Sequence, residues 1–213
     1  MKSIAIAAGA AAAVLAAGAA SASVVLSDNF DSDAQKLNWR GDAVFSSLPG
    51  PANEEPRIAS TDLIGTGFFN FYPGHGNYVD LDGSTGWGNT PYAGILQSNA
   101  SFGAGTYTLS FDLGGNARGA AAQTTQIWLG STLVASLTLD SSSPWTLYRY
   151  SVDTAGGNLV FDELGPSDQQ GNILDNVTLA TGVPEPLSWT MMLLGAGLVG
   201  GALRRSRQAP IAG

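Results

Sequence analysis

The stretch GTYTLSFDLG, residues 105–114, indicates the fold class. Its apolar side chains, Tyr107, Leu109, Phe111 and Leu113, alternate with polar ones. A period of two places alternate side chains on opposite faces of a β-strand, whereas an amphipathic helix needs a period of 3.6. This stretch therefore predicts a strand that packs one face on a hydrophobic core.

Similar apolar runs occur further along the chain at short spacing, at 127–129, 133–139, 148–152, 159–161 and 173–179. Segments rich in Gly, Ser and Asn separate them, at 114–116, 141–144 and 155–158, and these compositions favour turns. Residues 23–182 show neither a helical period nor an internal repeat. Short strands joined by such turns predict an all-β sandwich or barrel.

The composition excludes several kinds of site and partner. The 213 residues include no cysteine and one histidine, so disulfides, thiolate zinc sites, cysteine nucleophiles and His-rich metal sites are excluded. Charged residues make up 12 % of the chain, against about 25 % in a typical domain, which argues against a helical bundle. Five basic and sixteen acidic residues give 23–182 a net charge of −11. Such a surface repels phosphate backbones, so nucleic acid is not an expected partner.

Residues 1–22 have the pattern of a secretory signal peptide. Lys2 supplies the positive start, an Ala-rich apolar run comes next, and Ala20-Ser21-Ala22 is a small-x-small cleavage site. We expect cleavage there and a mature chain that begins at Ser23. The alternative is a membrane helix that stays attached.

The C-terminal end predicts a second membrane segment. Pro184 and Pro186 interrupt regular structure, and residues 187–203 then carry no charge. Seventeen uncharged residues are at the short end of what a membrane-spanning helix needs. The basic tail at 204–213 holds its own end in the cytoplasm, which leaves 23–182 outside the inner membrane.

The stretch VPEPLSWTMMLLGAGLVGGALRR, residues 183–205, resembles the PEP-CTERM sorting signal of Gram-negative bacteria, in its PEP-x-x-W-A variety. Thr190 stands where that pattern usually has Ala. The residues that carry the resemblance are Pro184, Glu185, Pro186, Trp189, Arg204 and Arg205.

This resemblance implies processing by an exosortase, a membrane-embedded cysteine transpeptidase that recognises 184–186 and cuts near it. The protein would be anchored transiently in the inner membrane and then pass to the cell surface or the extracellular matrix. Proteins with such signals typically accompany exopolysaccharide gene clusters and biofilm matrix. The alternative is a plain C-terminal anchor on a Pro-rich stalk.

The body, 23–182, is similar to the galactose-binding-like and carbohydrate-binding modules that fold as jelly-roll sandwiches. Three stretches carry this resemblance in order along the chain, at 77–83, 105–116 and 171–179. We therefore expect three parts: a signal peptide at 1–22, a jelly-roll β-sandwich at 23–182 and a sorting signal at 183–213.

The same resemblance implies a structural calcium ion where the first and last strands meet. Calcium prefers carboxylate, amide and carbonyl oxygens. The matching positions are Asp28, Asn29, Asp31 and Asp175. The alternative is that these side chains only cap the backbone of their own turns.

Aromatic residues next to glycines form a candidate carbohydrate site. A glycan site needs aromatic platforms and a few polar groups. The candidates are Phe71, Tyr72, His75, Tyr78, Trp87 and Tyr92. Alternatively, these rings close the ends of the sandwich.

No catalytic centre is evident. A serine nucleophile needs a base held by a third group, and the sequence has no Gly-x-Ser-x-Gly elbow. Neighbouring acids such as Glu54-Glu55 and Asp162-Glu163 would point to opposite faces of a strand.

We therefore expect a non-catalytic surface or matrix protein that binds carbohydrate or exopolysaccharide. The alternatives are a structural or adhesive protein without a small ligand, a hydrolase with two facing carboxylates, and an ice-binding protein. The last would need a Thr-x-Thr ladder, and only Thr106-Tyr107-Thr108 fits.

The sorting hypothesis predicts the mass of the surface form. We expect that form to end near Glu185, because a transpeptidase that recognises 184–186 removes the residues on the C-terminal side of its cut. Intact-mass spectrometry of protein recovered from the cell surface measures this end. A surface form that retains 187–213 would contradict the hypothesis.

Overall fold

The structure is a computed structural model, and it describes residues 22–48, 61–84, 93–165, 168–182 and Gly195. The predicted signal peptide therefore lies outside the described residues apart from Ala22, and the sorting signal lies outside them apart from Gly195. Within the described residues, no helix has the length and apolar character needed to cross a bilayer.

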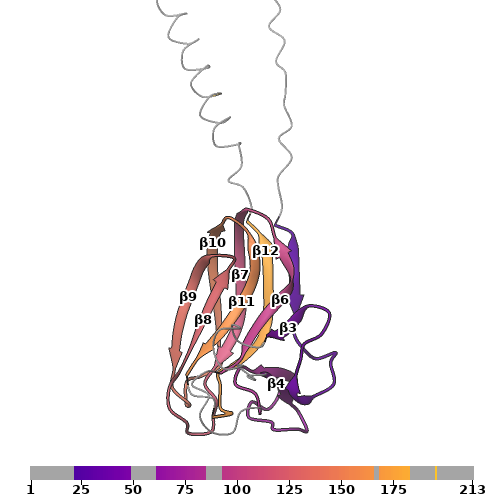
Figure 1. Cartoon of the computed structure of the whole chain (residues 1–213), viewed down its shortest axis with the longest axis vertical. Coiled ribbons are helices and arrows are strands. Elements are labelled where there is room, and N and C mark those ends of the chain that lie inside the picture. The colour runs from indigo at the N-terminus through magenta and orange to yellow at the C-terminus, as the bar shows by residue number, and fades with distance from the viewer. Residues whose placement is uncertain (1–21, 49–60, 85–92, 166–167, 183–194, 196–213) are drawn as a thin grey trace, which may run out of the picture. The chain divides into compact units, whose positions relative to one another are not determined.

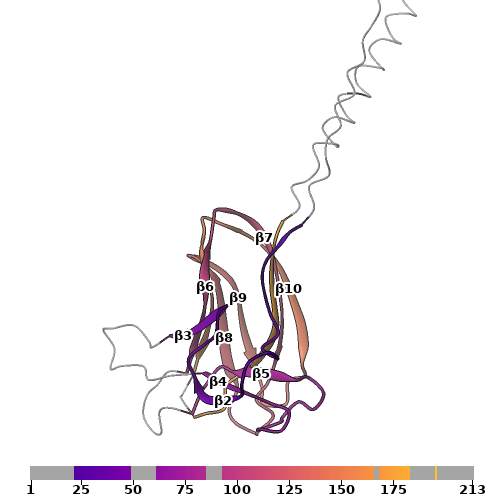
Figure 2. The ribbon, with the colours of Figure 1, turned by 90° about the vertical axis from the view of Figure 1, so that its right-hand side faces the viewer.

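The body is all-β, as the alternating patterns predict (Figure 1). The strands are β1 (Val24–Asp28), β2 (Lys36–Trp39), β3 (Phe45–Leu48), β4 (Thr61–Gly65), β5 (Asn77–Asp80), β6 (Ile95–Phe102), β7 (Gly105–Gly114), β8 (Gln123–Leu129), β9 (Thr132–Leu139), β10 (Thr146–Thr154), β11 (Gly157–Leu164) and β12 (Ile173–Thr181). They form two antiparallel sheets, and Figure 2 shows β6, β8 and β9 in one layer with β7 and β10 in the other. The jelly-roll sandwich expected from the resemblance is confirmed.

The larger sheet is organised around β12. Its strand order is β10-β7-β12-β5-β4-β2, and β1 also pairs with β12. One edge of β12 is shared, because Ile173 and Leu174 pair with β5 whereas 177–180 pair with β1. The two pairings are separated by a bulge at which Asn176 has a φ of 51°. Asn tolerates this left-handed conformation better than most residues.

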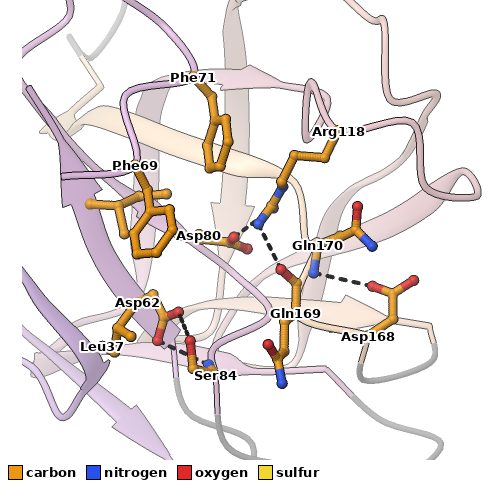
Figure 3. A pocket seen from close by; sticks show the side chains of 11 residues that line it. Leu37, Asp62, Phe69, Phe71, Asp80, Ser84, Arg118, Asp168, Gln169 and Gln170 are labelled. Carbon is orange, nitrogen blue, oxygen red and sulfur yellow. Dashed lines mark hydrogen bonds and ion pairs between the residues drawn. The ribbon is translucent and has the colours of Figure 1, made fainter. Parts of the chain in front are cut away.

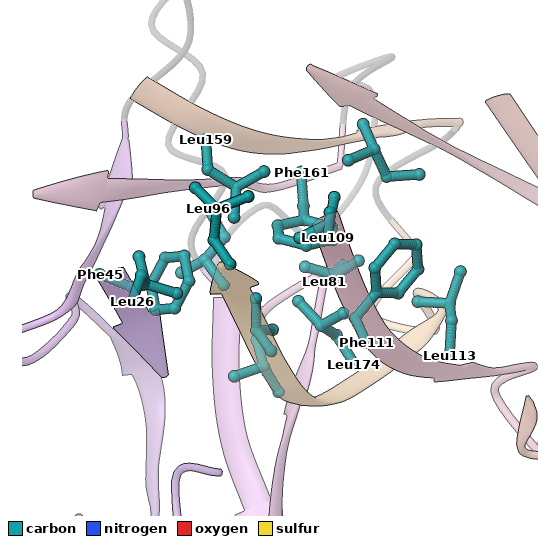
Figure 4. Packing of buried hydrophobic residues seen from close by; sticks show 14 of the residues in the cluster. Leu26, Phe45, Leu81, Leu96, Leu109, Phe111, Leu113, Leu159, Phe161 and Leu174 are labelled. Carbon is teal, nitrogen blue, oxygen red and sulfur yellow. The ribbon is translucent and has the colours of Figure 1, made fainter. Parts of the chain in front are cut away.

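The smaller sheet has the order β3-β6-β11-β8-β9. Its inward side chains meet those of β7 and β12 in one core (Figure 4). Phe111 of β7 and Phe161 of β11 are both fully buried, with ring centroids 5.2 Å apart and ring planes at 83°. Edge-to-face contacts of this kind add to the free energy of burying the rings.

The outer face of the larger sheet is also covered at one end. On β4, β5 and β12, adjacent residues belong to different apolar clusters. Leu63, Val79 and Leu174 lie in the main core, whereas Ile64, Tyr78 and Ile173 form a second buried cluster. Because adjacent side chains on a strand point to opposite faces, the second cluster lies on the outer face. Segment 68–72 packs over it, and this layer positions the candidate site.

The shared core predicts a strong effect of Phe161→Ala. We expect the free energy of unfolding to fall by about 3–5 kcal/mol, because removing a buried ring leaves a cavity between the sheets. Denaturant unfolding measures the loss. Leu147→Ala is the control, since Leu147 is 60 % exposed, and we expect a change within about 0.5 kcal/mol. Equal losses in the two variants would contradict this account of the core.

Candidate functional site

Three of the predicted carbohydrate-site residues gather in one aromatic cluster, Tyr72, His75 and Tyr78, together with Trp145. Trp145 lies between the rings, with its centroid 4.4 Å from His75, 4.8 Å from Tyr72 and 5.7 Å from Tyr78. The cluster covers the outer face of the larger sheet, where Ile173 lies. Of the other candidates, Phe71 packs against the same outer-face cluster, whereas Trp87 and Tyr92 lie outside the described residues.

Tyr78 and Tyr72 hold the loop in place. Tyr78 is fully buried, and its hydroxyl accepts hydrogen bonds from the backbone N–H of Phe71 at 2.6 Å and of Tyr72 at 3.0 Å. The Tyr72 hydroxyl donates to the carbonyl oxygen of Gly115 at 2.5 Å. Burial raises the pKa of both phenols, so each stays protonated and available as a donor. Of the three predicted residues in the cluster, only His75 is exposed.

A cavity of about 290 Å³ lies beside this cluster, over β2, β4 and β5 (Figure 3). Phe69 and Phe71 form one side, and Gln169 and Gln170 lie across from them. The remaining lining residues are Leu37, Asp62, Ile64, Asp80, Ser84, Arg118 and Asp168.

Two carboxylates face each other across the floor of the cavity. Asp62 of β4 pairs with Asp80 of β5 in the strand register, so both side chains lie on the outer face. Arg118 neutralises Asp80, with its Nη2 2.6 Å from Asp80 Oδ2. Burial raises the pKa of Asp80, and the guanidinium of Arg118 opposes that rise.

Arg118 is fixed by further contacts. Its guanidinium donates to the carbonyl oxygen of Asn116 at 3.1 Å and to that of Gln169 at 2.6 Å. Its central carbon also lies 4.7 Å from the centroid of the Phe71 ring, which is a cation–π distance. Arg118 therefore connects the aromatic side of the cavity, formed by Phe69 and Phe71, to the glutamine side, formed by Gln169 and Gln170.

The glutamine side is held by a buried carboxylate. Asp82 Oδ2 accepts hydrogen bonds from the backbone N–H of Asp168 at 2.7 Å and of Gln169 at 2.6 Å. Asp80 Oδ1 accepts the N–H of Gly171 at 2.9 Å. A Cβ on Gly171 would lie 2.3 Å from the backbone nitrogen of Asp82, so this close approach requires glycine. These contacts fix the backbone of the loop that carries the two glutamines.

Phe69 is the most accessible ring of the cavity, with 54 % of its surface exposed. Its centroid lies 6.4 Å from that of Phe71, and the two planes meet at 27°. Two nearly parallel rings opposite amide side chains form an apolar platform with polar groups beside it. Pockets that bind small molecules combine such apolar surfaces with a few polar groups.

A second acidic group lies at the end of β1. Carboxylate oxygens of Asp28, Asp33 and Asp42 lie within 4.8 Å of one another. Asp28 Oδ2 is buried and accepts no hydrogen bond. Burial, followed by the charges of Asp42 and Asp33, raises the pKa of Asp28 to about 7. The pKa of Asp33 is raised by burial and by Asp42.

The four predicted calcium ligands are only partly brought together. Asp28 belongs to the group at the end of β1, whereas Asp31 accepts the N–H of Asn77 at 2.8 Å and the side-chain amide of Asn29 at 3.1 Å. Asp175 accepts both the N–H and the side-chain amide of Asn176. Burial, and then the charges of Asp31, Asp112 and Asp28, raise the pKa of Asp175 to about 8.

A buried polar cluster lies between the sheets near the start of β12. Glu163 is fully buried and accepts hydrogen bonds from the Thr125 hydroxyl and from the N–H of Asn172. The Asn172 amide donates to the Thr125 hydroxyl oxygen at 2.9 Å. Burial raises the pKa of Glu163 from 4.5 to about 7.

Sequence reasoning found the aromatic loop but missed most of the cavity. Phe69 stands in the run FFNFY, residues 68–72, and the density of rings there is a signal that extends to it. Asp62, Arg118 and the two glutamines carry no such signal, because strand register and loop contacts bring them together. The same holds for Asp33 and Asp42.

The comparisons with known proteins address the sorting signal and the fold. Residues 182–208 match the family described as the PEP-CTERM protein-sorting motif, which confirms the predicted sorting signal. No curated protein matches the chain.

Among solved structures, the K1 cleaved adhesin domain of Lys-gingipain from Porphyromonas gingivalis matches with a TM-score of 0.54 and 12 % identity, over 74 % of this chain and 98 % of that one. The K3 domain of the same protein matches with a TM-score of 0.52 and 14 % identity, over 76 % of this chain and 100 % of that one. At these identities the likeness concerns the fold.

The raised pKa of Glu163 predicts a pH-dependent contribution to stability. Because the folded state raises this pKa, it binds the proton more tightly than the unfolded chain does, and the contribution is lost as the pH rises. Relative to Glu163→Gln, the wild type should lose up to about 1.4 kcal/mol of unfolding free energy per pH unit. We expect this loss between pH 4.5 and about 7, with no further change above it. Denaturant unfolding with chelator present measures the difference, and a pH-independent difference would contradict the prediction.

Proposed function

We propose that this chain is an exported, exosortase-sorted surface protein whose β-sandwich, 23–182, binds a carbohydrate without catalysis. In this proposal the signal peptide, 1–22, is removed on export. The helix at 187–203 and the basic tail at 204–213 hold the chain in the inner membrane until an exosortase cuts near the motif at 184–186. The product reaches the cell surface or the biofilm matrix, where exopolysaccharide is the expected ligand. The match to the sorting motif at 182–208 supports the sorting part.

The cavity beside the aromatic cluster carries the binding part of the proposal. It joins an exposed ring, Phe69, to a second ring and to the amides of Gln169 and Gln170 (Figure 3). Sugar rings present apolar C–H faces and hydroxyl edges, which suit an aromatic platform with planar polar groups nearby. A volume of about 290 Å³ is at the lower end for a small-molecule site, which suits one or two sugar units.

The two facing carboxylates favour binding over hydrolysis. A glycoside hydrolase needs two carboxyl groups that both reach the substrate. Asp80 is 1 % exposed, and its oxygens accept hydrogen bonds from Arg118, Asp82 and Gly171. Asp80 is therefore held by an ion pair and by hydrogen bonds that support the loop at 168–171, which disfavours a role in acid–base chemistry.

A structural calcium ion is the second part of the proposal, at Asp28 with Asp33 and Asp42. Three carboxylates lie close together, the pKa of Asp28 and of Asp33 is raised, and a buried oxygen of Asp28 accepts no hydrogen bond; this arrangement suits a hard divalent cation. The ion would neutralise their repulsion and fix the segment after β1. Asn29, Asp31 and Asp175 form hydrogen bonds with residues near this acidic group, so we assign them a structural role beside the ion.

The carbohydrate proposal predicts that Phe69→Ala weakens binding. We expect about a tenfold loss of affinity for the host exopolysaccharide, because the sugar loses its most exposed platform, a contact of roughly 1–2 kcal/mol. Calorimetric titration of the full chain, in a detergent without a sugar head group, measures it. Leu147→Ala is the control, since it removes an exposed apolar side chain from β10, away from the cavity. Tight binding that Phe69→Ala leaves unchanged would contradict the site.

The calcium proposal predicts a metal-dependent stability. At a calcium concentration of a hundred times Kd, the free energy of unfolding should rise by about 2.7 kcal/mol over that in chelator. Asp42→Asn should abolish this rise, whereas Asp140→Asn, at an exposed position outside the acidic group, should keep it. Thermal unfolding with and without calcium measures the difference. A wild-type Tm that does not respond to calcium would contradict the assignment.

A further inference from the structure

The charge of the cavity indicates which sugar it takes, and this inference rests on the proposed carbohydrate function. Of the residues that the structure describes, three carboxylates line the cavity, Asp62, Asp80 and Asp168, together with one guanidinium, Arg118. The surrounding domain, 23–182, has a net charge of −11. A cavity of this kind repels an anionic sugar and attracts a cationic one.

The register of β4 and β5 places two carboxylates side by side, which lowers the stability of the fold. Asp62 and Asp80 lie directly opposite each other on β4 and β5. Like charges in this position destabilise a sheet. Arg118 compensates Asp80, and its other hydrogen bonds go to the carbonyl oxygens of Asn116 and Gln169.

Among the described residues, hydrogen-bond donors surround Asp62 but no cation pairs with it. It is 5 % exposed and accepts hydrogen bonds from the backbone N–H of Asn38 at 2.6 Å and from the N–H and hydroxyl of Ser84 at 3.0 and 2.5 Å. Among the residues that the structure describes, no ion pair to Asp62 is formed. A carboxylate has about four acceptor positions, so these three donors leave one. Figure 3 shows Asp62 at the cavity, on the side of Ser84 and Leu37.

We propose that this cavity binds a hexosamine unit with a free ammonium group, with the ammonium at Asp62 and the sugar ring against Phe69 and Phe71. The ammonium supplies both the missing donor and the missing positive charge. A metal ion fits less well, because calcium takes six to eight oxygen ligands and the neighbouring Asp80 is already paired with Arg118. The apolar rings across the cavity suit the body of a sugar rather than the water shell of an ion.

The charge of the sugar substituent at Asp62 distinguishes three classes of sugar. A de-N-acetylated hexosamine satisfies Asp62, an N-acetylated one presents the same ring without the charge, and a uronic acid adds a like charge. Affinity should therefore fall in that order. Polysaccharides that carry free amino groups are the class of partner that the cavity selects.

The test compares chemically matched ligands on the unmodified full chain. Glucosamine oligosaccharides are titrated before and after N-acetylation, beside glucuronate oligosaccharides of the same length, in mildly acidic buffer where the amine carries its proton. The detergent has no sugar head group. We expect the free amine to bind at least about tenfold more tightly than the N-acetylated form, since a charge-assisted hydrogen bond is lost on acetylation. This comparison needs no variant, so misfolding cannot obscure it.

Two variants then test whether the carboxylate of Asp62 is the one that recognises the ammonium group. Asp62→Asn should bring the two affinities to within about twofold, since it removes the negative charge that distinguishes the ligands. Asp153→Asn is the matched control, because it removes an exposed carboxylate of β10 that does not line the cavity, and it should keep the preference.

The outcomes distinguish this inference from the proposed function. Equal binding of the free and N-acetylated sugars overturns the inference and leaves the carbohydrate site standing. No binding of any glycan, including the host exopolysaccharide, overturns both. An equal loss in Asp62→Asn and Asp153→Asn shows general attraction to an acidic protein and overturns the assignment to Asp62.

Discussion

The pairing of β12 within the larger sheet positions both the core and the candidate site. This last strand lies inside the larger sheet, with β7 on one edge and with β5 and β1 sharing the other. Its first residue, Ile173, anchors the aromatic cluster on the outer face, and its next residue, Leu174, enters the core between the sheets. The loop that precedes β12 forms one side of the cavity. The sorting motif begins just beyond the other end of the strand, at residue 182. Along the chain, β12 therefore connects the candidate site to the sorting motif.

Acidic residues give the cavity its negative charge, and two of them also hold the loop that precedes β12 in place. Asp80 and Asp82 receive the backbone N–H groups of the loop at 168–171, so the glutamine side of the cavity depends on two buried carboxylates. Such groups are stable only when donors or cations surround them. Asp80 has Arg118, whereas Asp62 and the group around Asp28 have no cation among the described residues. Both of our ligand proposals, a sugar ammonium and a calcium ion, arise from that difference.

The sequence predicts the second half of the sandwich well and the first half poorly. The strands from β7 to β12 are long, and most bury one face, so their side chains alternate visibly. By contrast, β4 is buried on both faces, and Thr61, Asp62 and Leu63 show no alternation. The strands β2 and β3 have four residues each, too few for a period to be evident.

The candidate site, too, could be predicted from the sequence only in part. Local density of rings identified the loop around Tyr72 and Tyr78, but the burial of Tyr78 depends on contacts with β12 that no local pattern contains. Asp62 and Arg118 are 56 positions apart in the chain and meet through strand register and loop contacts. Register and loop geometry are long-range properties, so single-sequence reasoning does not reach them.

We propose that the ligand binds in the cavity over β4 and β5. A crystal structure of the protein with the oligosaccharide that binds it most tightly tests this directly. We predict a sugar ring against Phe69 and Phe71, with polar groups within hydrogen-bond distance of Asp62 and the side chains of Gln169 or Gln170. A ligand bound elsewhere, such as on the outer face of the smaller sheet, with the cavity free of sugar, would contradict this proposal.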